Sequence, residues 1–386
     1  MTLMSDGFYD TIVIGVGAMG AAACDHLARR GQRVLGIEQF ELGHDRGSSH
    51  GQTRVIRKAY FEDSRYVPLL HDAYRLWREL EIVSGKPLMR MAGCVNIGPA
   101  DHPAIVGVLK SANDHHLPHE VLTAEVIRSR WPAFNCEERD IGVYEAEAGF
   151  LRPERCIGAM AESARCNGAV LHMNECVVRW EATDECVRVE TDRDRYDASK
   201  LVVTAGPWLS SVCSDLGLPL RVERQVQTWF TPTCAPDFGV GRLPSFIHFT
   251  GERAYYGIPI DADAPPPFNH AVKIARHHGG EIITPDTVQR EVTSADEADV
   301  RGYIRRFMPG ADGPLAAAKV CLYTNTPDDY FIIDRHPQHA HVFLAGGFSG
   351  HGFKFAPVVG EVLADLVTTG TTRHPIDLFS IARFGN

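Results

Sequence analysis

Apolar positions at the start of the chain follow a strand pattern, then a helical pattern, then a strand pattern again. Residues 10–15 are an apolar, β-branched run, residues 17–30 have helical composition up to Gly31, and residues 33–38 return to a strand-like run. The sequence therefore predicts a β-α-β unit at residues 10–38.

Further short strands are predicted along the chain. Residues 169–173, 176–180, 187–190 and 201–204 are strand candidates separated by Asp, Asn and Lys turns, and we expect a meander followed by a return strand. Near the end, residues 341–345 predict one more strand, and residues 358–368 predict a helix closed by Gly370.

Residues 221–308 differ in character, because they are rich in aromatic residues and prolines and contain the run Asp-Ala-Asp-Ala-Pro-Pro-Pro-Phe at 261–268. We interpret this part as a second, largely antiparallel domain that carries 261–268 as a loop. The predicted fold is α/β, or α+β overall. It has a discontinuous Rossmann-type domain at 1–90, 152–220 and 327–386, and a substrate-binding domain at 91–151 and 221–326.

Composition narrows the function classes. At 386 residues and 44% hydrophobic, the chain is too long for one compact core. Its net charge of −10 comes without a clustered basic face, so we expect no nucleic acid partner. Glycines interrupt the apolar stretches short of the roughly 20 residues that a membrane helix needs, so we expect no membrane span.

Neither end of the sequence shows a targeting signal. The first residues lack the basic and apolar regions of a secretory signal, and the last three are not a peroxisomal tripeptide. We therefore expect a cytoplasmic protein whose ten cysteines are reduced thiols, without C-x-x-C spacing. His115, His116 and His119 lack a matching carboxylate pattern, so no metal site is expected.

The predicted β-α-β unit carries the pattern Gly15-Val16-Gly17-Ala18-Met19-Gly20 between its first strand and its helix. Gly15 is suited to the tight turn, Gly17 to the approach of a pyrophosphate, and Gly20 to close helix packing. Glu38 ends the second strand, where a carboxylate accepts hydrogen bonds from a ribose. The unit therefore predicts a dinucleotide site, but it does not distinguish FAD from NAD.

Three further motifs decide between these cofactors. Gly-Ser-Ser-His-Gly-Gln-Thr-Arg-Val-Ile-Arg at 47–57 combines small, hydrogen-bonding residues with two arginines, an arrangement suited to a flavin and an anionic substrate. The other two are Cys-Leu-Tyr-Thr-Asn-Thr-Pro-Asp-Asp-Tyr-Phe-Ile-Ile-Asp-Arg-His at 321–336 and Ala-Gly-Gly-Phe-Ser-Gly-His-Gly-Phe-Lys-Phe at 345–355.

With these motifs, the chain resembles over its whole length the monomeric sarcosine oxidase family, with its relatives N-methyltryptophan oxidase and pipecolate oxidase. The first two motifs look closest to pipecolate oxidase. The resemblance implies a monomeric FAD enzyme that oxidises the C–N bond of a secondary amino acid such as sarcosine or L-pipecolate. The imine then hydrolyses, and O2 is reduced to hydrogen peroxide.

The resemblance also implies roles for individual residues. Cys321 matches the cysteine joined to the flavin 8α-methyl group, and Lys273 the lysine that promotes reaction with oxygen. His277 matches the active-site histidine, although the adjacent His278 leaves this assignment open. Arg57 and Lys354 match the pair that holds the substrate carboxylate, Arg54 matches the arginine beside the flavin ring, and Tyr256 and Tyr323 match pocket aromatics.

The cofactor contacts that we expect come from five parts of the chain. They are Gly15, Val16, Gly17, Ala18, Met19 and Gly20; Glu38 and Gln39; Ser48, Ser49, His50, Thr53 and Arg54; Val177, Ala205, Gly206 and Trp208; and Cys321, Gly347, Phe348, Gly350, His351, Gly352 and Lys354.

Two departures from the family limit the resemblance. The interval between Tyr256 and Lys273 looks longer than in sarcosine oxidase, which leaves the pocket size open, and Ser49 stands where sarcosine oxidase has a histidine. Three alternatives also stay open: a flavin dehydrogenase with a quinone or carrier acceptor, an NAD-dependent dehydrogenase, and a flavin-binding module without catalysis.

Overall fold

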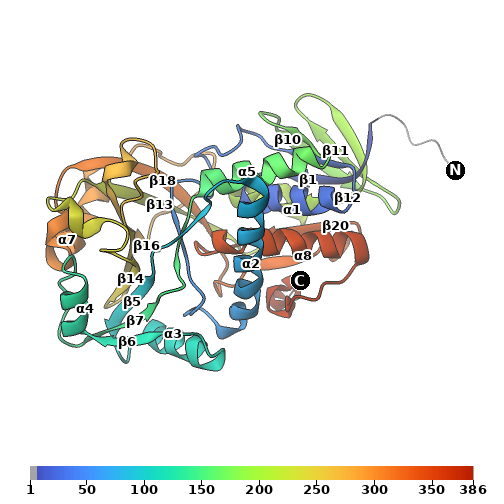
Figure 1. The fold of residues 1–386 in the computed structure, drawn as a ribbon. Coiled ribbons are helices and arrows are strands. Elements are labelled where there is room, and N and C mark those ends of the chain that lie inside the picture. The colour runs from blue at the N-terminus through green and yellow to red at the C-terminus, as the bar shows by residue number, and fades with distance from the viewer. Residues whose placement is uncertain (1–6, 386) are drawn as a thin grey trace.

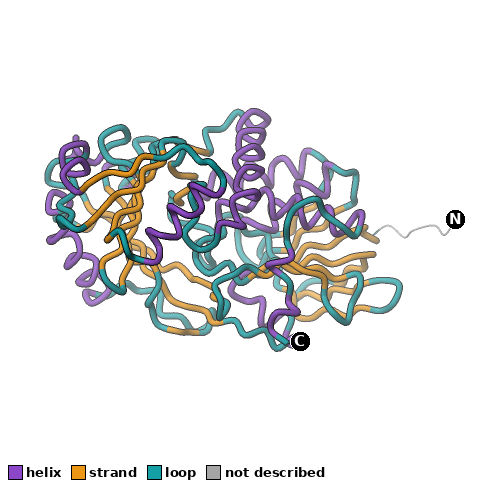
Figure 2. Tube along the Cα trace, turned by 90° about the horizontal axis from the view of Figure 1, so that it is seen from below, coloured by secondary structure: helices purple, strands orange, loops and turns teal. Residues whose placement is uncertain are grey.

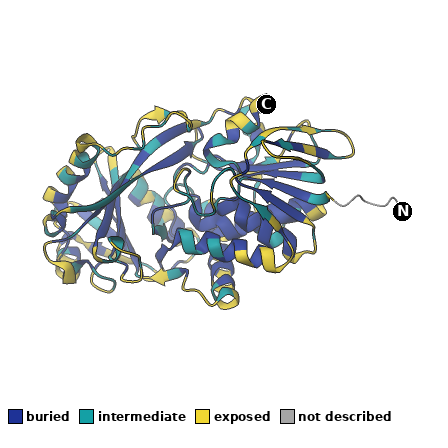
Figure 3. Cartoon of the chain, turned by 90° about the horizontal axis from the view of Figure 1, so that it is seen from above, coloured by how far each residue is buried: buried dark blue, intermediate teal, exposed yellow. Residues whose placement is uncertain are grey.

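The strands of this protein gather in two groups at opposite ends of the molecule, with helices between them. The computed structural model describes residues 7–385. Figure 2 shows strands gathered toward either end of the molecule, with a group of helices along one side of the middle and of the right-hand strands. Strands of both groups are mostly buried, and exposed residues lie mainly on loops and outer helix faces (Figure 3). The molecule therefore has two sheets with a shared helical middle.

The first sheet has eight strands in the order β10-β11-β12-β1-β2-β9, with β20 beside β12 and β19 beside β20. Strands β9, β2, β1, β12 and β20 run parallel to their neighbours in that series, whereas β10, β11 and β12 form an antiparallel meander. The strands are β1 (Phe8–Ile14), β2 (Val34–Ile37), β9 (Val170–His172), β10 (Val177–Ala182), β11 (Val187–Thr191), β12 (Arg195–Val203), β19 (Ile332–Arg335) and β20 (Val342–Gly346).

The predicted β-α-β unit is confirmed, with α1 (Ala18–Arg29) between β1 and β2. The predicted meander is confirmed only for its later strands, because β9 pairs with β2 and takes no part in it. The reason is the helix α5 (Pro153–Cys166) directly before β9, which acts as a crossover and leads to parallel pairing.

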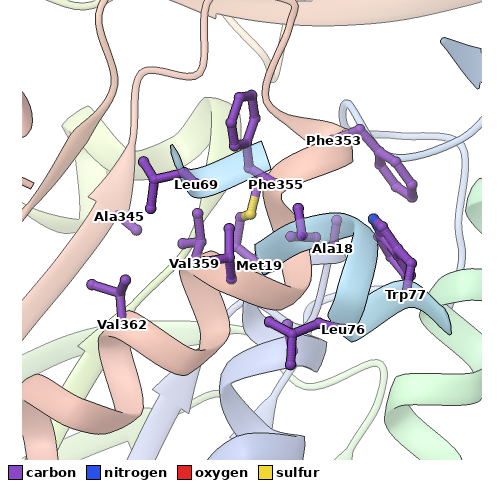
Figure 4. Packing of buried hydrophobic residues seen from close by; sticks show 14 of the residues in the cluster. Ala18, Met19, Leu69, Leu76, Trp77, Ala345, Phe353, Phe355, Val359 and Val362 are labelled. Atoms are coloured by element: carbon purple, nitrogen blue, oxygen red, sulfur yellow. The ribbon is translucent and has the colours of Figure 1, made fainter. Parts of the chain in front are cut away.

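Four helices fill the middle of the molecule. They are α1, α5, α2 (Val67–Ser84) and α8 (Ala356–Thr369). Met19 of α1, Leu76 of α2 and Val359 of α8 meet in one buried cluster (Figure 4). Gly360 lets α8 approach closely, since a Cβ there would lie 2.6 Å from Cβ of Ala22 on α1. As predicted, α8 ends at Gly370, which has a left-handed φ of 80°.

The second sheet has nine strands in the order β17-β13-β16-β15-β14-β5-β7-β6, with β18 beside β13. Its pairs are antiparallel except β5 with β14, so the prediction of a largely antiparallel second part is confirmed. The strands are β5 (Cys94–Pro99), β6 (Glu120–Thr123), β7 (Asp140–Glu145), β13 (Arg221–Phe230), β14 (Ser245–Thr250), β15 (Arg253–Ile258), β16 (Val272–His277), β17 (Ile282–Ile283) and β18 (Leu315–Asn325).

Smaller elements complete this part of the fold. Helices α3 (Pro103–Asp114), α4 (Ala124–Arg130) and α7 (Ser294–Phe307) surround the second sheet (Figure 1). A third sheet of three short strands, β3 (Arg54–Ile56), β8 (Gly149–Leu151) and β4 (Met89–Met91), is separate from the other two. A short helix, α6 (Leu209–Val212), follows β12.

The loop at 261–268 is held to the rest of the molecule by an ion pair. Arg152 precedes α5, and its guanidinium donates to both carboxylate oxygens of Asp261, at 2.6 and 2.7 Å. Both side chains are buried, so the loop begins from a fixed point. The division into two domains, with its boundaries, stays a prediction.

Two general expectations concern thiols and membranes. All ten cysteines are free, and six of them are buried. Within residues 7–385, no helix is long and apolar enough to cross a membrane.

Candidate active site

A cavity of about 790 Å³ lies at the carboxyl ends of the parallel strands. Its wall includes residues 14–19 after β1, 37–39 after β2 and 204–208 after β12, together with 322–324 and 347–350. Ligands of open α/β sheets bind at this edge, where successive strand connections diverge. We call residues 15–20 with Glu38 the nucleotide end of the site.

Glycine is required at two positions of the nucleotide end. Gly15 has a φ of 84°, and a Cβ there would lie 2.7 Å from the carbonyl oxygen of Thr204. A Cβ at Gly20 would lie 1.8 Å from the carbonyl oxygen of Gly15. At Gly17, by contrast, a Cβ would meet only Ser49 Oγ at 3.6 Å, so the backbone there is open for a ligand to approach.

Glu38 is buried at the same end and shapes the turn. Its Oε2 accepts a hydrogen bond from the backbone N–H of Val16 at 2.9 Å, and its Oε1 accepts from Phe40 at 3.1 Å. The carboxylate therefore ties the second strand to the glycine turn. Across the cavity, Trp208 Nε1 donates to Asp286 at 2.7 Å, so a loop of the second sheet reaches the first.

Two cations, the buried Lys273 and the half-buried Arg54, lie beyond the nucleotide end. Lys273 on β16 is 1% exposed and donates to Gly51 O at 3.0 Å, Thr53 O at 2.9 Å and Gln227 Oε1 at 2.6 Å. Burial, and then the guanidinium of Arg54, hold the pKa of Lys273 well below its usual range. Trp229 and Tyr256 place ring faces 5.0 and 5.9 Å from the ammonium.

Arg54 connects this lysine to a cysteine. Its Nη1 donates to Gln227 Oε1 at 3.2 Å, and its Nη2 contacts the sulfur of Cys321 at 3.5 Å and Ser48 O at 3.1 Å. Cys321 lies on β18 and is 1% exposed. Since the guanidinium touches the sulfur, negative charge that develops there has a partner.

A second pair of cations lies nearby around Tyr60. The ring of Tyr60 is 4.5 Å from the Arg57 guanidinium and 5.1 Å from the Lys354 ammonium. Burial, and then the charge of Arg57, lower the pKa of Lys354 to about 7. We call Arg54, Arg57, Lys273, Cys321 and Lys354 the charged end of the site.

Arg57 has a carboxylate partner within the chain. Its Nη2 lies 2.9 Å from Oε2 of Glu62, and its Nη1 donates to Ala59 O at 2.6 Å. Burial acts to raise the pKa of Glu62, but Arg57, His351 and Lys354 together outweigh it and hold that pKa below its usual range. The positive charge of Arg57 is therefore already paired with a carboxylate of the same chain.

The predicted histidine and tyrosines lie together. His277 Nδ1 is 3.4 Å from the hydroxyl of Tyr323, and the rings of His277 and Tyr256 are 6.4 Å apart. Burial, then neighbouring His278, hold the pKa of His277 well below its usual range. His278 has a φ of 62° and points its Nδ1 to within 3.8 Å of Glu223. The two histidines thus face different partners.

Not every predicted cofactor residue lines the cavity. The wall includes Ser48, Ser49, Arg54, Val177, Ala205, Gly206, Trp208, Gly347, Phe348, Gly350 and Gly352, besides residues 15–19, Glu38 and Gln39. Gly20, His50, Thr53, Cys321, His351 and Lys354 are buried and do not line it. Lys273, His277, Tyr256 and Arg57 do not line it either, and all of these except His277 are buried.

Several neighbours of the charged end were missed by the sequence analysis. Gln227 on β13 touches both Lys273 and Arg54, and Glu154 accepts hydrogen bonds from the backbone of Gly51 and Gln52. The sequence of β13 contains a signal that could have identified Gln227. Polar residues recur there at every second position within a buried strand, which indicates that one face of the strand lines a polar site.

Asp215, His336 and His339 are a group that could suggest a metal site within residues 7–385. However, the backbone N–H of Gln338 donates to His336 Nδ1, which leaves the proton on Nε2. That nitrogen lies 2.8 Å from Asp215 and donates to it. His336 is thus engaged as a hydrogen-bonding residue on both ring nitrogens.

Comparisons with known proteins extend over almost the whole chain. A family model described as FAD dependent oxidoreductase matches residues 10–366. A monomeric sarcosine oxidase of Streptomyces avermitilis is 43% identical over 382 residues, 97% of each protein. An N-methyl-L-tryptophan oxidase of Salmonella arizonae is 37% identical over 97% of this chain and 99% of its own. Among solved structures, NikD, described as an unusual amino acid oxidase, has a TM-score of 0.86 at 23% identity over 97% of each chain.

Proposed function

This chain belongs to the family of FAD-dependent oxidoreductases, and we propose that it is an oxidase of a secondary amino acid, N-methyl or cyclic, such as sarcosine or L-pipecolate. The amine loses two electrons and two protons to become an imine, which water hydrolyses. O2 takes up the electrons and protons as hydrogen peroxide. The observation that carries this proposal is the cluster of four cations at the cavity, of which Arg54 lines the wall and Arg57, Lys273 and Lys354 are buried.

The residues present fit FAD. Besides the open backbone at Gly17, polar side-chain atoms near the cavity are buried without a partner within residues 7–385. They are both ring nitrogens of His50, the hydroxyls of Thr53 and Thr324, and the amide nitrogen of Gln227. Buried polar groups are nearly always hydrogen-bonded in complete proteins. When bound, FAD supplies the electron acceptor, and the chain supplies position and charge.

Cys321 is proposed to hold this cofactor covalently, through a thioether to the 8α-methyl group. Two observations support the assignment. The sulfur lies 3.7 Å from the carbonyl oxygen of Ser48, and the guanidinium of Arg54 touches it; both of these residues line the cavity. A thiolate is the nucleophile that such a bond requires, and Arg54 is placed to balance its charge.

Lys273 is proposed to promote the reaction with oxygen. Its ammonium is buried, fixed by three acceptors and close to a second cation. A fixed positive charge in a water-poor site stabilises negative charge as it develops on oxygen.

Arg57 and Lys354 are proposed to hold the substrate carboxylate, while His277, Tyr256 and Tyr323 line the space for the amine. Two cations on separate segments orient a carboxylate better than one. Because Glu62 already occupies Arg57, a substrate carboxylate must replace one anion with another. This exchange favours substrates that carry a carboxylate over amines without one.

A substrate panel tests the proposal. Sarcosine, L-pipecolate, L-proline and N-methyltryptophan are each mixed with the protein without oxygen, and bleaching of the flavin is followed by absorbance. We expect at least one to bleach it, and no bleaching by any secondary amino acid would contradict the function. Air is then admitted: rapid reoxidation indicates an oxidase, whereas slow reoxidation favours the dehydrogenase with a quinone or carrier acceptor.

We also propose that the protein is a monomer, on the ground that its relative of 43% identity is named a monomeric enzyme. Size-exclusion chromatography with light scattering should give a mass near 42.6 kDa.

A further inference from the structure

Gln227 lies between Lys273 and Arg54 and belongs to none of the family motifs. We propose that Gln227 is a positioning residue that keeps the Lys273 ammonium protonated and fixed beside Arg54, and thereby sets the reactivity of the enzyme with oxygen. The inference rests on the proposed role of Lys273.

The geometry fixes the orientation of the Gln227 amide. Its Oε1 accepts from Lys273 Nζ at 2.6 Å and from Arg54 Nη1 at 3.2 Å, and the side chain is 2% exposed. Both cations only donate hydrogen bonds, so the carbonyl oxygen, not the amide nitrogen, must face them. One neutral oxygen therefore bridges two like charges.

The acceptors around Lys273 match the charged form of the side chain. An ammonium has three N–H groups, and Gly51 O, Thr53 O and Gln227 Oε1 accept one each. A neutral amine has two N–H groups and a lone pair, which would face one of these oxygens. Of the three acceptors, Gln227 is the one that a point mutation can remove, since the others belong to the backbone.

Other groups around Lys273 act in both directions. Arg54 of β3 opposes its charge, whereas Cys321 of β18 and Glu154 of α5 favour it. The ring faces of Trp229 and Tyr256 also favour a cation. The charge of Lys273 contributes to lowering the pKa of His50, which falls to about 3 mainly by burial. Burial and Arg54 favour the neutral amine of Lys273. The short hydrogen bond from Lys273 to Gln227 acts in the opposite direction, and it stabilises the ammonium by about as much as one charge-assisted hydrogen bond.

A neutral acceptor differs from a carboxylate at this position. Glutamate would neutralise one of the two cations, whereas glutamine leaves both positive charges for a developing anion. The loop also accommodates the amide, because a Cβ at Gly51 would lie 2.0 Å from Gln227 Oε1. The absence of a side chain at Gly51 therefore leaves room for the Gln227 amide next to the backbone.

The direct test measures the protonation of Lys273 in the flavin-loaded protein by NMR of lysine labelled with ¹³C at Cε. The resonance is assigned by its loss in Lys273→Met. Gln227→Leu should lower the pKa of Lys273 by about one to two units, the equivalent of one hydrogen bond to a charged group. Gln227→Glu should raise it. An unchanged Lys273 pKa in both variants would overturn the proposal.

A kinetic measurement complements the spectrum. In stopped-flow reoxidation by O2, Gln227→Leu should lower the pH at which the rate falls, by the same amount as the Lys273 pKa measured by NMR. Thr228→Val is the matched control, because Thr228 lies next to Gln227 on the opposite face of β13 and bonds only Ile274 O. Equal effects of the control and Gln227→Leu would show a structural role and overturn the proposal.

The two proposals fail separately. If Lys273→Met leaves reoxidation unchanged, the role of Lys273 in the proposed function is wrong. If Lys273→Met slows reoxidation but the Gln227 variants shift neither the titration nor the rate profile, only the inference about Gln227 is wrong.

Discussion

The nucleotide end and the charged end of the site are built in opposite ways. The nucleotide end is made from one short stretch of chain, with glycines and backbone groups at an open cavity wall. The charged end collects side chains from β3 and the residue after it, from β16, from β18 and from the segment before α8, which are far apart in sequence, and all of them except Arg54 are buried. The first depends on backbone shape, and the second depends on charges held away from water. Mutations should therefore act on cofactor retention in one region and on rates in the other.

The largest effect is expected at the nucleotide end, for Gly20→Ala. The added Cβ would lie 1.8 Å from the Gly15 carbonyl oxygen, so the turn cannot keep its shape. We expect nearly complete loss of bound flavin, measured as visible absorbance per chain, and a lower melting temperature. Gly17→Ala is the control, because its Cβ meets only Ser49 Oγ at 3.6 Å and the fold should persist. Full flavin content in Gly20→Ala would contradict the claim that backbone shape at the nucleotide end determines cofactor retention.

Cys321→Ala tests the link between the two ends. Wild-type protein precipitated with acid should stay yellow, because a thioether survives denaturation, whereas the variant should release all its flavin into the supernatant. Cys213→Ala, which changes another buried cysteine, should behave like the wild type. If wild-type flavin also appears wholly in the supernatant, the covalent assignment is wrong while the dinucleotide site stands.

Lys273→Met should affect rate without affecting cofactor content. Removing one fixed group that stabilises developing charge costs on the order of 100- to 1,000-fold in rate. Stopped-flow reoxidation by O2 should slow by this factor, and anaerobic reduction by amine should change much less. Similar slowing of both half-reactions would instead assign Lys273 to the positioning of the flavin or the substrate.

Arg57→Ala and Lys354→Ala should have a smaller effect, on a different half-reaction. A hydrogen bond between charged groups contributes about 1.5–3 kcal/mol, so kcat/KM should fall about 10- to 150-fold. Flavin content should hold. An amine analogue without the carboxylate should be a poor substrate that neither variant impairs much further. A variant that loses as much on the analogue as on the amino acid does not bind the carboxylate.

The smallest effect concerns pH. Lys354 binds a carboxylate in its protonated form, and its pKa is lowered to about 7 by burial and by Arg57. The favourable charge is therefore present below pH 7 and is lost as the pH rises through that value. We expect kcat/KM, which reports the free enzyme, to fall by about tenfold above pH 7. The fall should be absent in Lys354→Met, and its persistence there would assign it to another group.

The same contrast explains what the sequence could predict. The β-α-β unit, the glycine turn and the end of α8 at Gly370 depend on neighbouring residues, and local patterns predicted them. The pairing of β9 with β2 and the contact of Gln227 with Lys273 depend on which strands lie side by side, and no local pattern contains that information. The family motifs named Lys273 and Arg57, but not the partners Gln227 and Glu62 that the fold brings to them.

Gly51 is held as glycine for two separate reasons. Its φ of 101° disfavours any other residue, and the amide of Gln227 fills the space that a Cβ would take. If one reason disappears during evolution, the other remains, so the space above position 51 persists. A smaller or apolar residue at position 227 therefore leaves the loop conformation at Gly51 in place. If Gln227 acts on Lys273 as proposed, oxygen reactivity can change by substitution at this one position while the glycine stays.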